Sequence, residues 1–213
     1  RSSSMKYHLV GYYMRVFVPF LLAVTLTACG SSSGLSQATD NAAAADALKD
    51  RLDETPVSPP AQLPTLGTAE YSGFMFIDLP VTPDNPSLQT AYVGQMRLVV
   101  AFDERAEPLS GTAAGFTDRL NVALGGQLDL GGGTVFRGND PDSNYTLEGA
   151  VAGRLNHPDV GAMVVDGSIA GEFRGLNQEG VQGVVFGDVT SSLGEELFDG
   201  SFAAERQIEE DAP

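Results

Sequence analysis

Short apolar stretches separated by turn residues fill the chain from Gly67 onward. In two of them apolar and polar residues alternate with a period of two, the pattern of a β-strand that buries one face. In the stretch 144–155 the apolar face holds Tyr145, Leu147, Gly149, Val151, Gly153 and Leu155. In the stretch 163–174 it holds Met163, Val165, Gly167, Ile169, Gly171 and Phe173. Both stretches are therefore expected to be strands with these residues turned inward.

Eight stretches have strand character, and a strand is expected in each: 68–79, 91–102, 109–117, 126–137, 144–155, 163–174, 181–189 and 197–206. No long helical pattern lies between them to supply crossovers, so consecutive strands should pair antiparallel. Eight such strands can close into an up-and-down barrel filled by side chains, and alternate inward glycines leave room for neighbouring rings. The sequence predicts an all-β barrel domain over 67–206, followed by an acidic tail, 207–213.

The beginning of the chain has a different texture. Arg15 precedes an uncharged apolar run, 16–26, which is too short for a membrane-spanning helix but has the length of a signal-peptide core. Leu26-Thr27-Ala28-Cys29 then resembles a bacterial lipobox. The resemblance implies a lipoprotein signal peptide over 1–28, with Met5 or Met14 as the start, cleavage before Cys29, and acylation of that cysteine. The alternative is an ordinary secreted protein with an unrelated cysteine.

Residues 29–66 are expected to form a lipidated cysteine followed by a disordered Ala/Ser/Pro-rich tether. About two helical turns are expected around 43–52, and a flexible chain of this length spans about 30–35 Å. Gly30 stands where an aspartate would favour retention at the inner membrane in enterobacterial sorting. By that resemblance the protein is expected at the outer membrane.

Charge and composition exclude several functions. The sequence has 12 basic and 28 acidic residues, a net charge of −16, which opposes binding to nucleic acid or to anionic lipid by charge. Removing 1–28 would remove three basic residues and no acidic one, so the mature chain would be more acidic still. A single cysteine cannot form an internal disulfide.

Residues that could carry chemistry are few. His157 is the only histidine after the signal peptide, and it is expected to be solvated in a loop. Asp140, Asp142 and Asn144 begin like a calcium loop, but Tyr145 replaces its turn glycine and Val151 its closing glutamate. The adjacent Glu195 and Glu196 are expected to lie in a solvated turn, and the triple glycine 131–133 lacks the helix of a phosphate loop. The sequence predicts no enzyme, no metal and no cofactor.

Two segments resemble a known family. The stretch 180–206 contains Val185-Phe186-Gly187, then Glu195-Glu196-Leu197, then Gly200 and Phe202, and it resembles the last barrel hairpin of transferrin-binding-protein-B-like surface lipoproteins. The stretch 99–111, with Phe102-Asp103 followed by Leu109-Ser110-Gly111, resembles a strand–turn–strand of the same family. The resemblance covers about 67–206 and implies an outer-membrane-anchored barrel that faces the surface. It departs from the transferrin receptors, which have two lobes with handle domains, so transferrin itself is not an expected ligand.

These features lead to a functional hypothesis: a monomeric surface lipoprotein whose barrel loops, at one end of the barrel, bind a protein or assist acquisition of a nutrient such as iron or haem. The expected binding loops are 80–90, 103–108 and 138–143, with Asp84, Asn85, Asp103, Glu104, Asp140 and Asp142 as contacts.

Three alternatives remain open. One is a structural envelope lipoprotein without a ligand. Another is a lipocalin-like carrier of a small apolar ligand, which needs a hollow barrel, whereas large inward residues such as Tyr145, Met163 and Phe173 favour a filled one. A transmembrane barrel is opposed by the lipid anchor, the absence of tryptophan and the many glycines on the apolar face.

Overall fold

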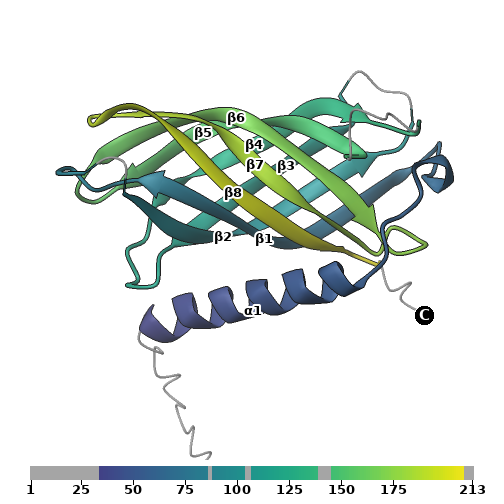
Figure 1. Cartoon of the computed structure of the whole chain (residues 1–213), viewed down its shortest axis with the longest axis horizontal. Coiled ribbons are helices and arrows are strands. Elements are labelled where there is room, and N and C mark those ends of the chain that lie inside the picture. The colour runs from purple at the N-terminus through teal and green to yellow at the C-terminus, as the bar shows by residue number, and fades with distance from the viewer. Residues whose placement is uncertain (1–33, 86–87, 104–106, 139–144, 209–213) are drawn as a thin grey trace, which may run out of the picture. The chain divides into compact units, whose positions relative to one another are not determined.

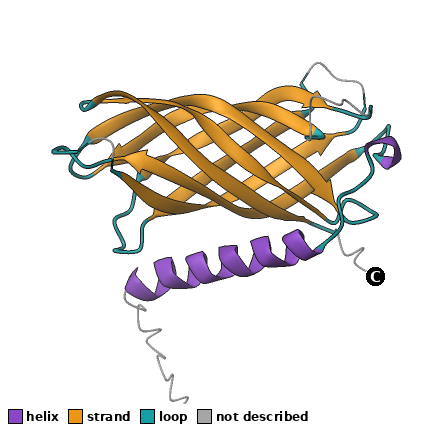
Figure 2. Cartoon of the chain, in the orientation of Figure 1, coloured by secondary structure: helices purple, strands orange, loops and turns teal. Residues whose placement is uncertain are grey.

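A computed structural model describes residues 34–85, 88–103, 107–138 and 145–208. The described chain begins with helix α1 (Gly34–Glu54) and a short 3-10 helix, η1 (Pro60–Gln62) (Figure 1). Eight strands follow: β1 (Thr68–Pro80), β2 (Gln89–Ala101), β3 (Leu109–Thr117), β4 (Gly125–Val135), β5 (Leu147–His157), β6 (Gly161–Arg174), β7 (Gly180–Ser191) and β8 (Gly194–Arg206). Each strand pairs antiparallel with the next, and β8 pairs with β1 (Figure 2). The predicted closed up-and-down barrel is confirmed.

The barrel interior is filled. One continuous cluster of buried apolar side chains receives members from all eight strands, and Met75, Leu98, Leu128 and Val151 are completely buried in it. The inward face predicted for 163–174 is confirmed, since the apolar side chains of that face are all buried. Tyr145 is a correction: it precedes β5, is only partly buried, and lines a shallow hollow on the outer surface. The strand that was expected to turn it inward begins at Leu147.

Inward glycines provide seats for two phenylalanine rings of β8. In register across β6, β7 and β8 lie the rows Gly167–Gly187–Phe198 and Gly171–Gly183–Phe202. A Cβ at Gly171 would stand 2.7 Å from Cζ of Phe202 and 2.6 Å from the carbonyl oxygen of Gln182. Both distances are well inside van der Waals contact, so the ring packs where a side chain on β6 is missing.

The expectation of a disordered tether is wrong for residues 34–54, although the two helical turns expected around 43–52 are found there. They form α1, a helix of 21 residues that lies along the outside of the barrel (Figure 1). Leu48 and Leu52 are buried against Ala203 of β8 and pack with Phe74 of β1. The physical reason is that β1 turns apolar side chains outward as well as inward, and this outer strip is stabilised by a cover that removes it from water.

The proline-rich segment 55–67 is also packed against the barrel, at the end where β6 finishes. The Ser58 amide donates to the Phe173 carbonyl (2.8 Å), and the Gly175 amide donates to the Pro56 carbonyl (2.8 Å). Leu63 is buried and belongs to the core cluster. The Arg137 guanidinium donates to the Pro64 carbonyl (2.7 Å). The segment therefore caps one end of the barrel instead of extending away from it.

Candidate binding surfaces

An up-and-down barrel places its connections alternately at two rims. One rim, the hairpin rim, consists of the connections 81–88, 118–124, 158–160 and 192–193. The capped rim consists of the connections 102–108, 136–146 and 175–179, together with the covering segment 55–67. Any partner that binds one end of the barrel meets one of these two sets.

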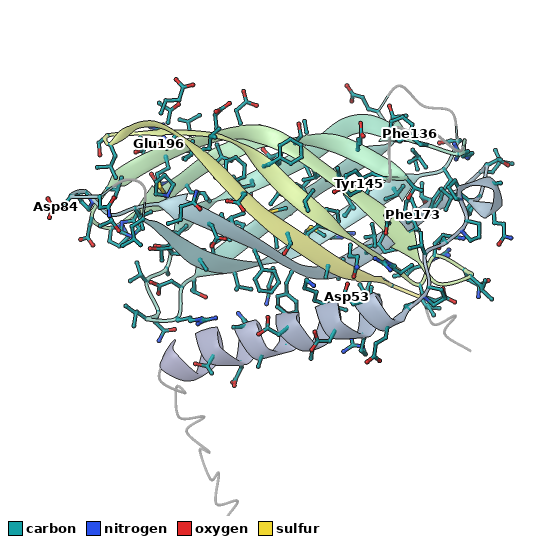
Figure 3. The ribbon with its side chains drawn as sticks, viewed as in Figure 1. Asp53, Asp84, Phe136, Tyr145, Phe173 and Glu196 are labelled. Carbon is teal, nitrogen blue, oxygen red and sulfur yellow. The ribbon has the colours of Figure 1, made fainter. Side chains whose placement is uncertain are left out.

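The expectation that the three candidate loops share one end is wrong. Asp84, labelled in Figure 3, and Asn85 are exposed on the hairpin rim. Asp103 is half-buried at the capped rim. The connections that contain Glu104, Asp140 and Asp142 leave from the capped rim, although these three residues lie outside the described part of the chain. Since β1–β2 and β2–β3 are successive connections, they must fall at opposite ends.

Most residues of the family-like motifs serve the barrel itself. Phe102 is buried, with its ring centroid 5.5 Å from that of Phe173, and Phe202 lies in the core. A Cβ at Gly111 would overlap the Arg97 carbonyl oxygen, and one at Gly200 would overlap the Phe76 carbonyl oxygen. These positions hold strands together and leave no side chain for a partner.

Phe186 differs from these residues, because it points outward and is 49% exposed. In register it lies between Ser168 of β6 and Asp199 of β8. Two shallow surface hollows share Ser168 and Phe186. Leu197, at the start of β8, is 71% exposed on the same side. The sequence motif marked Phe186 but gave no indication that it is a surface residue, which only its register with outward-facing neighbours reveals.

Carboxylates surround this exposed aromatic. Asp166 and Asp188 are direct cross-strand neighbours on β6 and β7, and Asp78 and Asp199 are neighbours on β1 and β8. Burial, followed by the negative charge of Asp199, raises the pKa of Asp78. Directly opposed like charges destabilise a strand pair, so this acidic face carries an electrostatic cost. A basic partner would relieve it.

Glu195 and Glu196 are the second and third residues of β8, on the hairpin rim (Figure 3). Glu195 pairs with Thr190 and Glu196 with Val189, after a turn in which the Leu193 amide donates to the Ser191 hydroxyl (3.1 Å). The expectation that the two glutamates lie in a turn is wrong, because β8 begins before them; Glu195 is exposed and Glu196 is half-buried. They add negative charge to this rim.

The prediction that His157 is solvated in a loop is wrong. It is the last residue of β5 and is 7% exposed. Its Nδ1 accepts the amides of Asp159 (3.1 Å) and Val160 (3.3 Å), and its ring meets that of Tyr92 edge-on at 6.4 Å. Burial, followed by the charges of Asp118 and Asp159, raises the pKa of Tyr92 to about 12. His157 thus fixes a hairpin turn and donates no group to a site.

Within the described residues, no three His, Cys, Asp or Glu side chains are grouped so that they could hold a metal ion. Asp140, Asp142 and Asn144, the calcium-loop-like residues, lie outside that part, as does Cys29.

None of the helices in the described residues is both long enough and apolar enough to cross a membrane.

Neither a protein-family model nor a curated protein sequence matches this chain, so the resemblance to transferrin-binding-protein-B-like lipoproteins stays a prediction from the motifs quoted above.

Proposed function

We propose that the protein is an outer-membrane lipoprotein, anchored through an acylated Cys29, whose barrel binds a protein partner or assists acquisition of a nutrient such as iron or haem. The observation that carries the proposal is the sequence Leu26-Thr27-Ala28-Cys29, placed directly after an apolar run. Signal peptidase cleavage there would leave a cysteine at the new N-terminus. Several acyl chains on one residue hold a protein stably on a membrane, whereas a single chain does so only marginally.

The distribution of polar side chains supports a barrel held beside the membrane rather than inside it. Charged residues such as Asp129, Arg154 and Asp188 point outward from the middle of their strands, and the interior is apolar. A barrel that crosses a bilayer has the opposite arrangement, and a basic side chain facing the lipid midplane costs about 2–4 kcal/mol.

The filled interior directs binding to the outer surface. A carrier of small apolar molecules needs a lumen, and here side chains from every strand occupy it. Binding must therefore use a rim or the outer face of the strands, both of which carry net negative charge in a sequence of −16. A partner steered by charge would present basic groups, and its association would slow as the salt concentration rises.

The anchor is tested by growing cells with a radioactive fatty acid. The parent protein and the Ser31→Ala variant, which leaves the four lipobox positions intact, should both incorporate the label. Cys29→Ser should not, and label retained in that variant contradicts the anchor.

Orientation in the envelope is tested separately by adding protease to intact cells. Degradation of the barrel supports surface display. Protection until the outer membrane is permeabilised would instead favour a structural lipoprotein that faces the periplasm.

A further inference from the structure

Helix α1 lies lengthwise along the barrel, and its two ends contact opposite halves of it. At its C-terminal end, Asp53 accepts a hydrogen bond from the Gln182 side chain (2.7 Å), and Arg51 pairs with Glu205 (2.7 Å) (Figure 3). Gln182 is near the start of β7 and Glu205 near the end of β8, so both belong to the capped half of the barrel.

The N-terminal half of α1 lies near the other rim. Thr39, Ala42 and Ala43 line a hollow together with Ala91 of β2 and with 117–119, where β3 ends. Those segments border the connections of the hairpin rim. The helix therefore begins beside the hairpin rim.

The length of α1 is close to the height of the barrel. At about 1.5 Å per residue, the 21 residues of α1 extend about 31 Å. Strands of 13 residues at about 3.3 Å each, tilted by about 40°, give a barrel roughly 30 Å high. One helix is long enough to connect the two rims.

We infer that α1 is a strap that fixes the orientation of the barrel on the membrane, with the hairpin rim towards the lipid surface that holds Cys29 and the capped rim away from it. This rests on the proposed lipid anchor. Cys29 precedes Gly34 by five residues, and a chain of that length reaches at most about 17 Å. A flexible tether of 29–66 would have left the orientation free.

The inference assigns the two rims different occupants. The hairpin rim, including Asp84 and Asn85, lies next to lipid headgroups. The capped rim is the end that a protein partner can reach, and its described residues are 102–103, 107–108, 136–138, 145–146, 175–179 and the covering segment. Exposed leucines do not distinguish the two rims, because Leu88 and Leu120 lie on the hairpin rim and Leu66 and Leu176 on the capped rim. The path of α1 does distinguish them.

The course of α1 is tested on the full, unacylated chain by pulsed electron spin resonance. One nitroxide is attached to Cys29 and a second to Asp84→Cys on the hairpin rim or to Asn177→Cys on the capped rim. The distance to position 84 should be shorter than that to position 177 by roughly half the barrel height or more, about 15–30 Å. Equal broad distributions, or a shorter distance to position 177, would overturn the inference.

Variants in α1 provide the control. Leu52→Asp or Leu48→Asp removes an apolar contact between helix and barrel and should broaden both distance distributions, while circular dichroism reports whether the barrel stays folded. Asp50→Ala, at an exposed helix position, should leave the distances unchanged. Sharp, unchanged distances in both leucine variants would contradict a strap seated by these residues.

Orientation on the membrane is then measured with the acylated protein in lipid vesicles. Acylation blocks the Cys29 thiol, so a dye reacts only at Asp84→Cys or Asn177→Cys. Energy transfer to a headgroup acceptor should be stronger from position 84, and equal or reversed transfer overturns the orientation. Because the spin-label distances need no acylation, a failed anchor with intact distances refutes the proposed function alone.

Discussion

Replacing Gly171 with valine should overpack the barrel where Phe202 crosses from β8. Gly171 is inward-facing on β6, and a Cβ there would meet the Phe202 ring at 2.7 Å and the Gln182 carbonyl oxygen at 2.6 Å. A normal carbon–carbon contact is about 3.5–4.0 Å, so the ring or a strand must move by roughly 1 Å. Overpacking of this kind costs about 1–3 kcal/mol of unfolding free energy.

The change is measured by thermal and urea unfolding, followed by far-ultraviolet circular dichroism because the chain has no tryptophan. A loss of about 1–3 kcal/mol corresponds to a fall in Tm of about 2–12 °C for a domain of this size. Gly131→Val is the matched control, because the nearest atom to its Cβ would be 3.7 Å away, an ordinary contact. A Gly171 variant as stable as the parent, or a control equally destabilised, would refute glycine seats for the phenylalanine rings.

Two further changes follow from the outer face of the barrel. Burial and the charge of Asp199 raise the pKa of Asp78 in the folded state. The free energy of unfolding therefore falls as the pH rises from the pKa of this carboxyl in the unfolded chain through its higher pKa in the folded protein. Asp78→Asn should therefore raise Tm at pH 7. The gain should disappear below about pH 4, where the carboxyl of the unfolded chain is also protonated. The control is Asp84→Asn, which changes an exposed loop carboxylate, and the same gain in that variant would contradict this explanation. A fragment of 66–206 should give a β-rich spectrum as a detergent-free monomer, but with reduced stability, because each lost leucine of α1 or the cap contributes about 1.5–3 kcal/mol. A helical spectrum or a need for detergent would refute an independently folding barrel.

The strands were predictable because a closed barrel imposes a simple alternation. In β6 every second residue must enter the core, so the apolar series from Met163 to Phe173 indicates both the strand and its inward face. Strand ends were less certain, because hydrogen bonding continues as far as a turn allows. β5 extends two residues beyond Leu155, the predicted end, and this extension carries His157 into a buried position.

Only part of helix α1 was predicted from its own pattern, the two turns expected around 43–52. Among residues 39–54, the part of α1 whose side chains are described, only Ala45, Leu48 and Leu52 are buried, too few for a clear apolar stripe in an Ala- and Asp-rich segment. The available signal was in β1, where Phe74 and Phe76 lie on the face opposite to Met75 and Ile77. A strand that is apolar on both faces is stabilised by a cover, and α1 supplies it here. The rim on which each candidate loop lies could have been predicted from the strand order alone, because successive connections alternate between the two rims.

The lipid anchor at Cys29 is tested most directly by the mass of the N-terminal peptide of the protein, purified from its own membrane. We expect a mature chain that begins at Cys29 and carries a diacylglyceryl group on the thiol and an acyl group on the amine. A chain that begins at another residue, or an unmodified cysteine in that peptide, would contradict the anchor on which both the proposed function and the orientation of the barrel depend.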